Sequence, residues 1–186
     1  IGKWHLGYLQ KHHPMNFGFQ KFVGFKSGNV DYQSHRNRYG DVDWWDGLEM
    51  KNMPGYTTTL LTTLSEDYIK ENKDKPFCLY IAHAAPHSPM QGPNEKAIRT
   101  EATLEGDKNS DRPNKEIYKD MVEELDWSVG RILETLKKYK LDKNTFVVFF
   151  SDNGPVINNG GSTGGYRGAK GAPWEGGHRV PGICYM

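Results

Sequence analysis

Two segments of the chain, residues 57–72 and 117–139, carry apolar residues at three- and four-residue spacing. This spacing gathers the apolar side chains on one face of a helix and leaves the charged residues on the other. Lysines crowd the end of the second segment, where positive charge suits the helix dipole. We therefore predict two amphipathic helices, whose apolar stripes are Leu60, Leu61, Leu64, Tyr68 and Ile69 in the first, and Ile117, Met121, Val122, Leu125, Val129, Ile132, Leu133 and Leu136 in the second.

Each predicted helix is followed by a short run of apolar residues, 76–82 after the first and 145–150 after the second. Such runs are typical of strands buried on both faces of a parallel sheet. The alternation of helix and strand predicts an α/β fold, in which functional loops follow the carboxyl ends of the strands. Residues 183–186 indicate a further strand. Residues 1–56 and 92–113 lack a sustained period, and we predict loops there, with short strands in the first.

Length and composition narrow the classes of function. The chain has 186 residues, of which 36% are hydrophobic, so it is one domain or a piece of a larger one. A net charge of +1 argues against binding to nucleic acid through bulk charge. No apolar run reaches the length of a membrane span. Cys78 and Cys184 lie in apolar runs, which predicts two buried free thiols rather than a disulfide framework.

The first candidate for chemistry is the lysine–histidine pair in residues 2–7, which read Gly-Lys-Trp-His-Leu-Gly. In an extended segment, the side chains of Lys3 and His5 point to the same side. The flanking glycines allow the backbone to approach a ligand closely. Lys3 brings a fixed positive charge, and His5 brings a group that exchanges protons near neutral pH. The pair therefore suits the binding of an oxyanion.

Two polar loops follow the predicted strands. Residues 83–89, His-Ala-Ala-Pro-His-Ser-Pro, form a proline-braced loop that can hold the imidazole of His87 still. A surface histidine bonded to backbone is the alternative for His87, and His83 is interpreted as structural. Asp152 and Asn153 offer a carboxylate and an amide oxygen, the ligands that Ca²⁺ or Mg²⁺ prefers. The alternative for this pair is an Asx-turn that closes the strand.

The glycine-rich residues 164–181 contain Lys170, which can reach an anionic ligand or lie in a flexible linker. Trp174 argues against a linker because a tryptophan usually packs. Trp44 and Trp45 can stack on a sugar, although core packing suits at least one of them better. The other histidines lack zinc spacing and are interpreted as loop residues near the site: His12, His13 and His35.

Taken in order, these motifs resemble one family closely, the formylglycine-dependent sulfatases of the alkaline-phosphatase-like fold. The likeness is greatest to the branch of arylsulfatase B and N-acetylgalactosamine-6-sulfatase, and it covers nearly the whole chain. The resemblance implies an α/β fold with a mainly parallel or mixed sheet flanked by helices. The matching segments are residues 2–7, 18–25, 31–35, 85–89, 151–154, 167–170 and 174–181.

The resemblance also implies a role for each matched position. Lys3 and Lys170 would bind the sulfate and neutralise the charge that develops on it. His87 would contact the substrate and protonate the leaving alcohol or phenol as general acid. His5 would draw a proton from the nucleophile. These four residues are therefore the candidate catalytic residues.

A metal and a nucleophile complete the implied site. Asp152 and Asn153 would ligate Ca²⁺, with Mg²⁺ as an alternative, and Ser34 falls where the family has residues near the substrate. The family's nucleophile is a formylglycine made from the first residue of a Cys/Ser-x-Pro-x-Arg motif. Neither Cys78 nor Cys184 lies in such a motif. The acidic pair that completes the family's calcium site is also absent from these residues.

We expect residues 1–186 to be the central part of a longer catalytic domain, without an internal boundary and inactive by itself. The first strand, the nucleophile segment and the C-terminal part of the fold would lie outside it. The implied reaction is hydrolysis of an aryl or carbohydrate sulfate by a periplasmic, secreted or lysosomal protein that a formylglycine-generating enzyme matures. Two alternatives remain open: a phosphonate or phosphodiester hydrolase of the same superfamily, and a non-catalytic protein that binds sulfated glycans.

Overall fold

The structure is a computed structural model that describes residues 1–101 and 111–186. Both predicted helices are confirmed, as α1 (Thr57–Asn72) and α2 (Asn114–Lys138). The second begins three residues earlier than its apolar stripe, because its first turn is polar. A four-residue helix, α3 (Glu175–His178), and three short 3-10 turns lie in the loops: Gln10–His12, Pro14–Phe17 and Ile157–Asn159.

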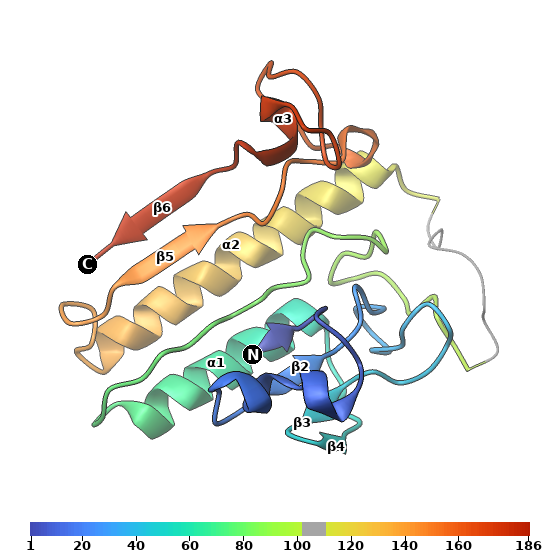
Figure 1. Cartoon of the computed structure of the whole chain (residues 1–186). Coiled ribbons are helices and arrows are strands. Elements are labelled where there is room, and N and C mark those ends of the chain that lie inside the picture. The colour runs from blue at the N-terminus through green and yellow to red at the C-terminus, as the bar shows by residue number, and fades with distance from the viewer. Residues whose placement is uncertain (102–110) are drawn as a thin grey trace.

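The two long helices lie side by side (Figure 1). The strands within residues 2–50 lie beside α1, and the strands within residues 147–185 lie beside α2. Their contact includes a hydrogen bond of 2.5 Å between the hydroxyls of Thr62 and Ser128. The helices bury Leu61 and Met121 completely, in one core with Trp44, which is also fully buried. The expectation that at least one of the paired tryptophans packs in the core is therefore confirmed. Along the described chain, no helix combines the length and apolarity that a membrane span requires.

The first sheet has the order β1-β2-β3-β4, with β1 parallel to β2 and the other pairs antiparallel. Its strands are short, as predicted for this loop-rich region. On its other side, β1 meets the extended segment around Ala82 through a parallel bridge to Gly2. Their bounds are β1 (Gly2–Lys3), β2 (Val23–Phe25), β3 (Trp45–Asp46) and β4 (Glu49–Met50).

Two glycines allow β1 to lie closely between its neighbours. A Cβ on Gly2 would lie 2.1 Å from the carbonyl oxygen of Ala82, and a Cβ on Gly24 would lie 2.1 Å from the carbonyl oxygen of Gly2. Both glycines also have positive φ angles, 106° and 149°, which L-residues rarely adopt. Backbone therefore encloses β1 on both sides, and the position of Lys3 at its end is fixed.

The second sheet pairs β5 (Val147–Phe150) with β6 (Gly182–Tyr185) in antiparallel register. The predicted strands at 145–150 and 183–186 are thereby confirmed. Among the described residues, the parallel pairing predicted from the alternation of helix and strand is found only around β1, so the fold is α/β with mixed sheets, as the family resemblance implies.

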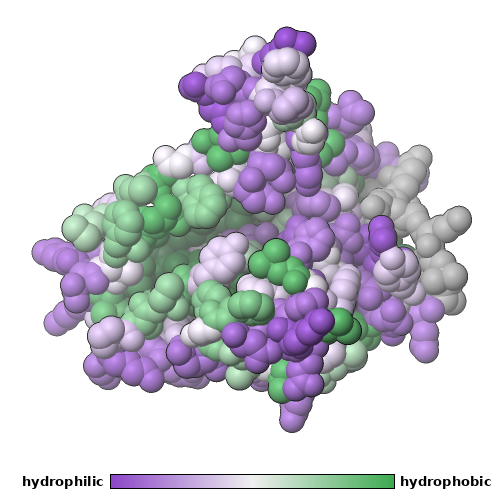
Figure 2. Space-filling view, in the orientation of Figure 1, coloured by the Kyte–Doolittle hydropathy of each residue, from purple (hydrophilic) through white to green (hydrophobic). Residues whose placement is uncertain are grey.

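Three expectations about burial are wrong. The run 76–82, expected to be a buried strand, forms no regular strand, and only its last residue makes a bridge. The strand β5, also expected to be buried, exposes 59% of Phe150. Cys78 and Cys184 are free thiols as predicted, but both are exposed. The side chains of β5 and β6, with Cys184 among them, are exposed because β5 has β6 as its single strand partner among the described residues, and no described strand lies beyond. Hydrophobic residues gather in the region of β5 and β6 in Figure 2.

The predicted loop at 92–113 is tested in part. Residues 92–100 contain no helix or strand, as expected, and 102–110 lie outside the described residues. The carbonyls of Pro93 and Glu95 accept hydrogen bonds from the side chain of Gln33, at 3.1 and 3.0 Å. The first part of this loop is therefore tied to the segment that follows β2.

Candidate active site

The lysine–histidine pair continues from β1 along the edge of the first sheet. Trp4 N–H donates to the carbonyl of Phe25 at 2.9 Å, and His5 N–H donates to that of Lys26 at 3.2 Å. At His5 the backbone turns into the left-handed region, with φ of 54°. Non-glycine residues rarely adopt this conformation, and it is common at functional sites. The turn leaves the side chain of His5 exposed beyond the end of the strand.

Gly28 is the contact that shapes the space around His5. A Cβ at this glycine would lie 2.6 Å from His5 Nε2 and 2.8 Å from its Cε1. These separations are too short for any real side chain. The imidazole therefore lies against bare backbone, and residue 28 must lack a side chain for His5 to keep this position.

His87 is held in the loop that follows Ala82. Its Nδ1 lies 2.8 Å from the carbonyl oxygen of Ser88, which can only accept, so Nδ1 carries the proton of this bond. The hydroxyl of Tyr32 donates to the backbone carbonyl of His87 at 2.9 Å. Nε2 is therefore the ring atom available to a substrate, and the bond of Nδ1 to the Ser88 carbonyl is also what the alternative of a histidine bonded to backbone predicts.

Lys170 is fixed by the backbone of the loop after β5. Its N–H donates to the carbonyl of Pro155 at 3.0 Å, and Gly154 N–H donates to the carbonyl of Gly177 at 2.8 Å. A Cβ on Gly154 would lie 2.0 Å from the carbonyl oxygen of Gly176. The glycine-rich segment is therefore packed on the segment that carries Asp152, and the flexible-linker alternative for Lys170 is wrong.

These elements bring five of the predicted residues into one electrostatic cluster, which we call the sulfate cluster: Lys3, His5, His87, Asp152 and Lys170. Burial lowers the pKa of Lys3, and among its neighbours Asp152 raises it and Lys170 lowers it. Burial also lowers the pKa of His5, and Lys3 and Lys170 lower it further while Asp152 raises it. Two positive charges and one negative charge thus surround the pair of histidines.

His87 belongs to the same cluster. Burial lowers its pKa most, the hydrogen bond to Ser88 raises it, Lys170 and Lys3 lower it, and Asp152 raises it. In the absence of an anion, the two lysines therefore oppose protonation of the imidazole. A bound anion would offset their charge and favour the imidazolium form.

Asp152 and Asn153 fit a hard cation by the chemistry of their oxygens. Asp152 is exposed, and the amide nitrogen of Asn153 donates to the carbonyl of Gly154 at 3.0 Å, which leaves the amide oxygen as the ligand atom. Ca²⁺ takes six to eight oxygens, so these two side chains supply only part of a site. Within residues 1–101 and 111–186, no group of three His, Cys, Asp or Glu side chains is placed to hold a metal.

Other predicted residues lie outside the sulfate cluster. Ser34 donates its hydroxyl to the carbonyl of Arg99 at 2.9 Å and so has a structural partner. His13 is buried with Nε2 2.9 Å from the carbonyl oxygen of Gly47, and His35 packs 4.4 Å from the ring of Trp44. These histidines help to pack the loop region around the site.

Sequence reasoning assigned no role to Tyr32 or Gly28. Tyr32 lies in the segment that carries the family resemblance, but a single tyrosine gives no sign of a partner 55 residues away. Gly28 is one of 21 glycines, and its closeness to His5 follows from the fold. Both act through other residues, which is why spacing along the chain does not reveal them.

The whole chain is similar in sequence to known sulfatases. The chain is 32% identical over 194 residues to arylsulfatase J of Mus musculus, and 33% identical over 202 residues to N-acetylgalactosamine-6-sulfatase of Mus musculus. These alignments cover all of this chain but 31% and 36% of the relatives, so the chain spans about a third of their length.

Solved structures show the same fold. The crystal structure of Ps i-CgsB in complex with k-i-k-neocarrahexaose has a TM-score of 0.83 at 28% identity, covering 100% of this chain and 43% of that one. The PsFucS1 sulfatase from Pseudoalteromonas sp. has a TM-score of 0.66 at 23% identity, covering 100% and 41%. These neighbours confirm the alkaline-phosphatase-like fold. Because the family model named Sulfatase also matches residues 1–186, the chain belongs to the sulfatase family.

Proposed function

We propose that the protein containing this chain hydrolyses sulfate esters at the sulfate cluster. The observation that carries the proposal is the convergence of Lys3, Lys170 and His87, from three separate segments, around the carboxylate of Asp152. Two cations suit the negative charge that a bound sulfate ester shares among its non-bridging oxygens and the charge that develops on its leaving oxygen. A histidine beside them suits proton transfer to the leaving group.

The first task of the chain is to bind and hold the sulfate group. Lys3 and Lys170 approach from β1 and from the loop packed on Gly154. Both backbone positions are fixed before the substrate arrives, so little reorganisation is needed as charge develops. Lys3 is half-buried, and its charge acts more strongly there than it would in water.

The second task is to protonate the leaving oxygen. His87 keeps one proton on Nδ1 for the carbonyl of Ser88, so the proton that it delivers lies on Nε2. The bound sulfate offsets the two lysines and favours this protonated form. His87 is therefore protonated on Nε2 mainly in the complex with the substrate.

The nucleophile and the metal are supported by the family resemblance. His5, whose pKa burial lowers, suits the acceptance of a proton from the nucleophile. Asp152 and Asn153 would hold Ca²⁺, with further oxygens from outside this chain, and when bound the ion would supply positive charge for the sulfate oxygens. No described residue fits the formylglycine nucleophile, since neither Cys78 nor Cys184 lies in the required motif.

The proposed substrate is a sulfated carbohydrate or a small aryl sulfate. A neighbour at 28% identity was solved with k-i-k-neocarrahexaose, and one relative is named N-acetylgalactosamine-6-sulfatase; both support a carbohydrate. A formylglycine-generating enzyme would be the maturation partner. We place the protein in the periplasm, the secreted fraction or the lysosome, as the resemblance implies.

We further propose that residues 1–186 are the central part of one catalytic domain. The exposed apolar side chains on β5 and β6, such as Phe150 and Ile183, support it because a sheet face of this kind normally packs against further structure. By itself the chain would then be inactive.

The test is sulfate release from 4-nitrophenyl sulfate by the full-length protein, co-expressed with a formylglycine-generating enzyme. Turnover of this ester, with little turnover of bis(4-nitrophenyl) phosphate or a phosphonate ester, is expected. Faster turnover of the phosphorus esters would favour the phosphodiesterase alternative. Absence of any turnover, with retained binding of sulfated glycans, would identify a non-catalytic binding protein.

A further inference from the structure

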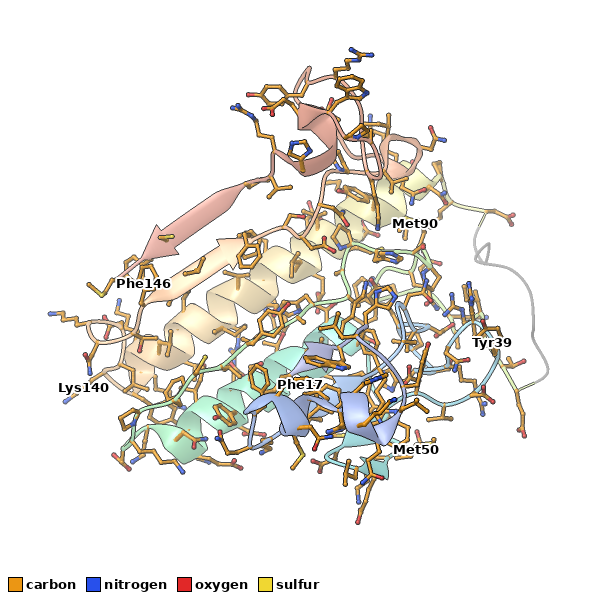
Figure 3. All side chains as sticks on the ribbon, viewed as in Figure 1. Phe17, Tyr39, Met50, Met90, Lys140 and Phe146 are labelled. Atoms are coloured by element: carbon orange, nitrogen blue, oxygen red, sulfur yellow. The ribbon has the colours of Figure 1, made fainter. Side chains whose placement is uncertain are left out.

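The chain that leaves β1 is tied back to it by the indole of Trp4. The indole N–H of Trp4 donates to the backbone carbonyl of His12 at 2.7 Å. The ring of Trp4 also lies near that of Phe17, with 6.1 Å between the ring centroids. Figure 3 shows Phe17 among the loops of the first sheet, apart from Phe146 just before β5. Residues 5–11 therefore form a loop that Trp4 and His12 close, and we call this pair the Trp4 clamp.

The far end of the clamp is anchored in the first sheet. His13, the residue after His12, is buried, and its Nε2 lies 2.9 Å from the carbonyl oxygen of Gly47 in the turn between β3 and β4. The ring of His13 also meets that of Phe22 edge-on, with 5.1 Å between the centroids. The carbonyl that Trp4 binds therefore belongs to a segment that is itself fixed.

The ring of His12 packs on bare backbone at Gly7. A Cβ at Gly7 would lie 2.4 Å from Nδ1 of His12 and 2.9 Å from its Cβ, and the φ angle of Gly7 is 122°. The clamp thus fixes the chain two residues beyond His5 as well as the residue before it. His5 itself has a φ of 54°, which costs a non-glycine residue conformational energy and persists only where its surroundings impose it.

The loop has little else to hold it in place. The N–H groups of Trp4 and His5 donate to the segment that continues β2, but these bonds fix the chain only up to His5. Beyond it, Leu6, Tyr8 and Leu9 keep 70%, 57% and 61% of their surface in solvent, so they supply little burial that could replace the clamp. The clamp therefore sets the direction in which the chain leaves His5, and with it the direction of the imidazole.

We propose that Trp4 is a positioning residue, which fixes the imidazole of His5 through the clamp with His12. This inference rests on the proposed function, in which His5 accepts a proton from the nucleophile. It gives a task to the residue between Lys3 and His5, which makes no contact with the substrate itself. A proton acceptor displaced by about 1 Å loses much of its rate advantage, so the loss of one remote hydrogen bond is enough to slow turnover.

The test is a double-mutant cycle in the full-length, matured protein, with 4-nitrophenyl sulfate as the substrate. Trp4→Phe keeps a ring near Phe17 and removes the indole N–H, and it should lower kcat about 10-fold with little change in KM. In the His5→Ala background the same substitution should have almost no further effect, because the group that it positions is gone. A merely structural tryptophan would slow both backgrounds by the same factor.

Trp127→Phe is the matched control, since Trp127 is 43% exposed on α2, and it should leave the kinetics unchanged. If Trp4→Phe does not fold, His12→Ala replaces it in the cycle, because it removes the ring that packs on Gly7.

Crystal structures of the full-length wild type and the clamp variant read the position of His5 without turnover. The imidazole should move by about 1 Å or occupy two positions in the variant. Equal losses in both backgrounds of the cycle, or an unmoved imidazole, would overturn the inference. A wild type without turnover, together with a displaced imidazole in the variant, counts against the proposed function alone.

Discussion

The hydroxyl of Tyr32 donates a hydrogen bond of 2.9 Å to the backbone carbonyl of His87, the proposed general acid. Tyr32 is itself held firmly. Its N–H donates to the side chain of Gln91 at 2.8 Å, its carbonyl accepts from Thr57, and its ring stacks on Tyr56 at 5.5 Å. A buried aromatic residue thus connects the start of α1 to the loop that carries the acid.

Tyr32→Phe is therefore expected to lower kcat several-fold with little change in KM. Loss of the hydrogen bond frees the His87 backbone, so proton transfer becomes less well aligned, and esters with poor leaving groups should suffer more than 4-nitrophenyl sulfate. Rates for a series of aryl and alkyl sulfates check this. Tyr56→Phe is the control, since it also removes a buried hydroxyl, one that donates to Gln91 at 2.8 Å and not to His87. Identical kinetics for the two variants would mean that Tyr32 is merely structural.

His87→Gln and Lys170→Ala should each reduce kcat/KM by about 10²–10³. They should differ in their dependence on the leaving group. Loss of the acid slows alkyl sulfates much more than 4-nitrophenyl sulfate, whereas loss of the lysine slows all esters to a similar extent. The slope of log(kcat/KM) against leaving-group pKa distinguishes them. Full activity of either variant would refute the assigned role.

Gly28→Ala should lower kcat at least tenfold while the protein stays folded. The added methyl group would lie 2.6 Å from His5 Nε2, so the imidazole or the loop must move, and misplacement by about 1 Å is enough to cost that much. Steady-state kinetics and a thermal melt measure the two effects. Gly130→Ala, on the exposed side of α2 with no atom within 4 Å, is the control and should leave activity intact. Wild-type kinetics in Gly28→Ala would show that His5 needs no fixed position.

The pH dependence of kcat/KM should report His87. Burial and the two lysines lower the pKa of this imidazole below its ordinary value of 6.5, and the reaction requires the protonated form. Activity of the free enzyme should therefore be lost as pH rises through a midpoint below 6.5. A pH profile of kcat/KM for a substrate with a poor leaving group checks this. A midpoint above 7.5, or the same basic limb in His87→Gln, would contradict it.

Stability should fall in acid because of a different histidine. Burial lowers the pKa of His83 to about 4, and its Nε2 lies 3.4 Å from the hydroxyl of Ser128 on α2. The unfolded chain takes up a proton near pH 6.5 and the folded protein does not. Stability is therefore complete above pH 6.5 and declines by up to about 3 kcal/mol as pH falls to 4.

His83→Gln should remove part of this acid sensitivity. The drop in melting temperature between pH 7 and pH 4.5 is the measurement, and the drop should be smaller in the variant than in the wild type, whatever the melting temperature at pH 7. His178→Gln is the control, since this histidine is exposed on α3. An unchanged drop in His83→Gln would show that another group governs the acid transition.

The helices could be predicted because burial along a helix repeats in the sequence. Leu61 and Ile69 lie two turns apart on α1 and are both buried, as their spacing implies. The burial of the strands was mispredicted because it depends on which other elements cover each strand, and that information does not repeat along the sequence. An apolar run such as 147–150 shows that a strand can be covered, but it does not show which elements cover it.

The site was predictable where it depends on order along the chain. His87 and Asp152 follow extended segments, so their meeting with Lys3 could be expected from the sheet and from the family resemblance. The supporting contacts were not predictable. The bond from Tyr32 to His87 and the packing of Gly28 on His5 depend on tertiary distances that no spacing along the chain encodes.

The bare backbone on both sides of β1 limits how such a pocket can be altered in the laboratory or by evolution. Because a side chain at Gly2 or Gly24 would collide with a backbone carbonyl, a library that randomises these two positions would yield mostly misfolded proteins. New substrate preferences must instead arise at exposed loop positions beside the site, of which Tyr8, three residues after His5, is one. A campaign to redirect substrate choice would randomise such loop codons first.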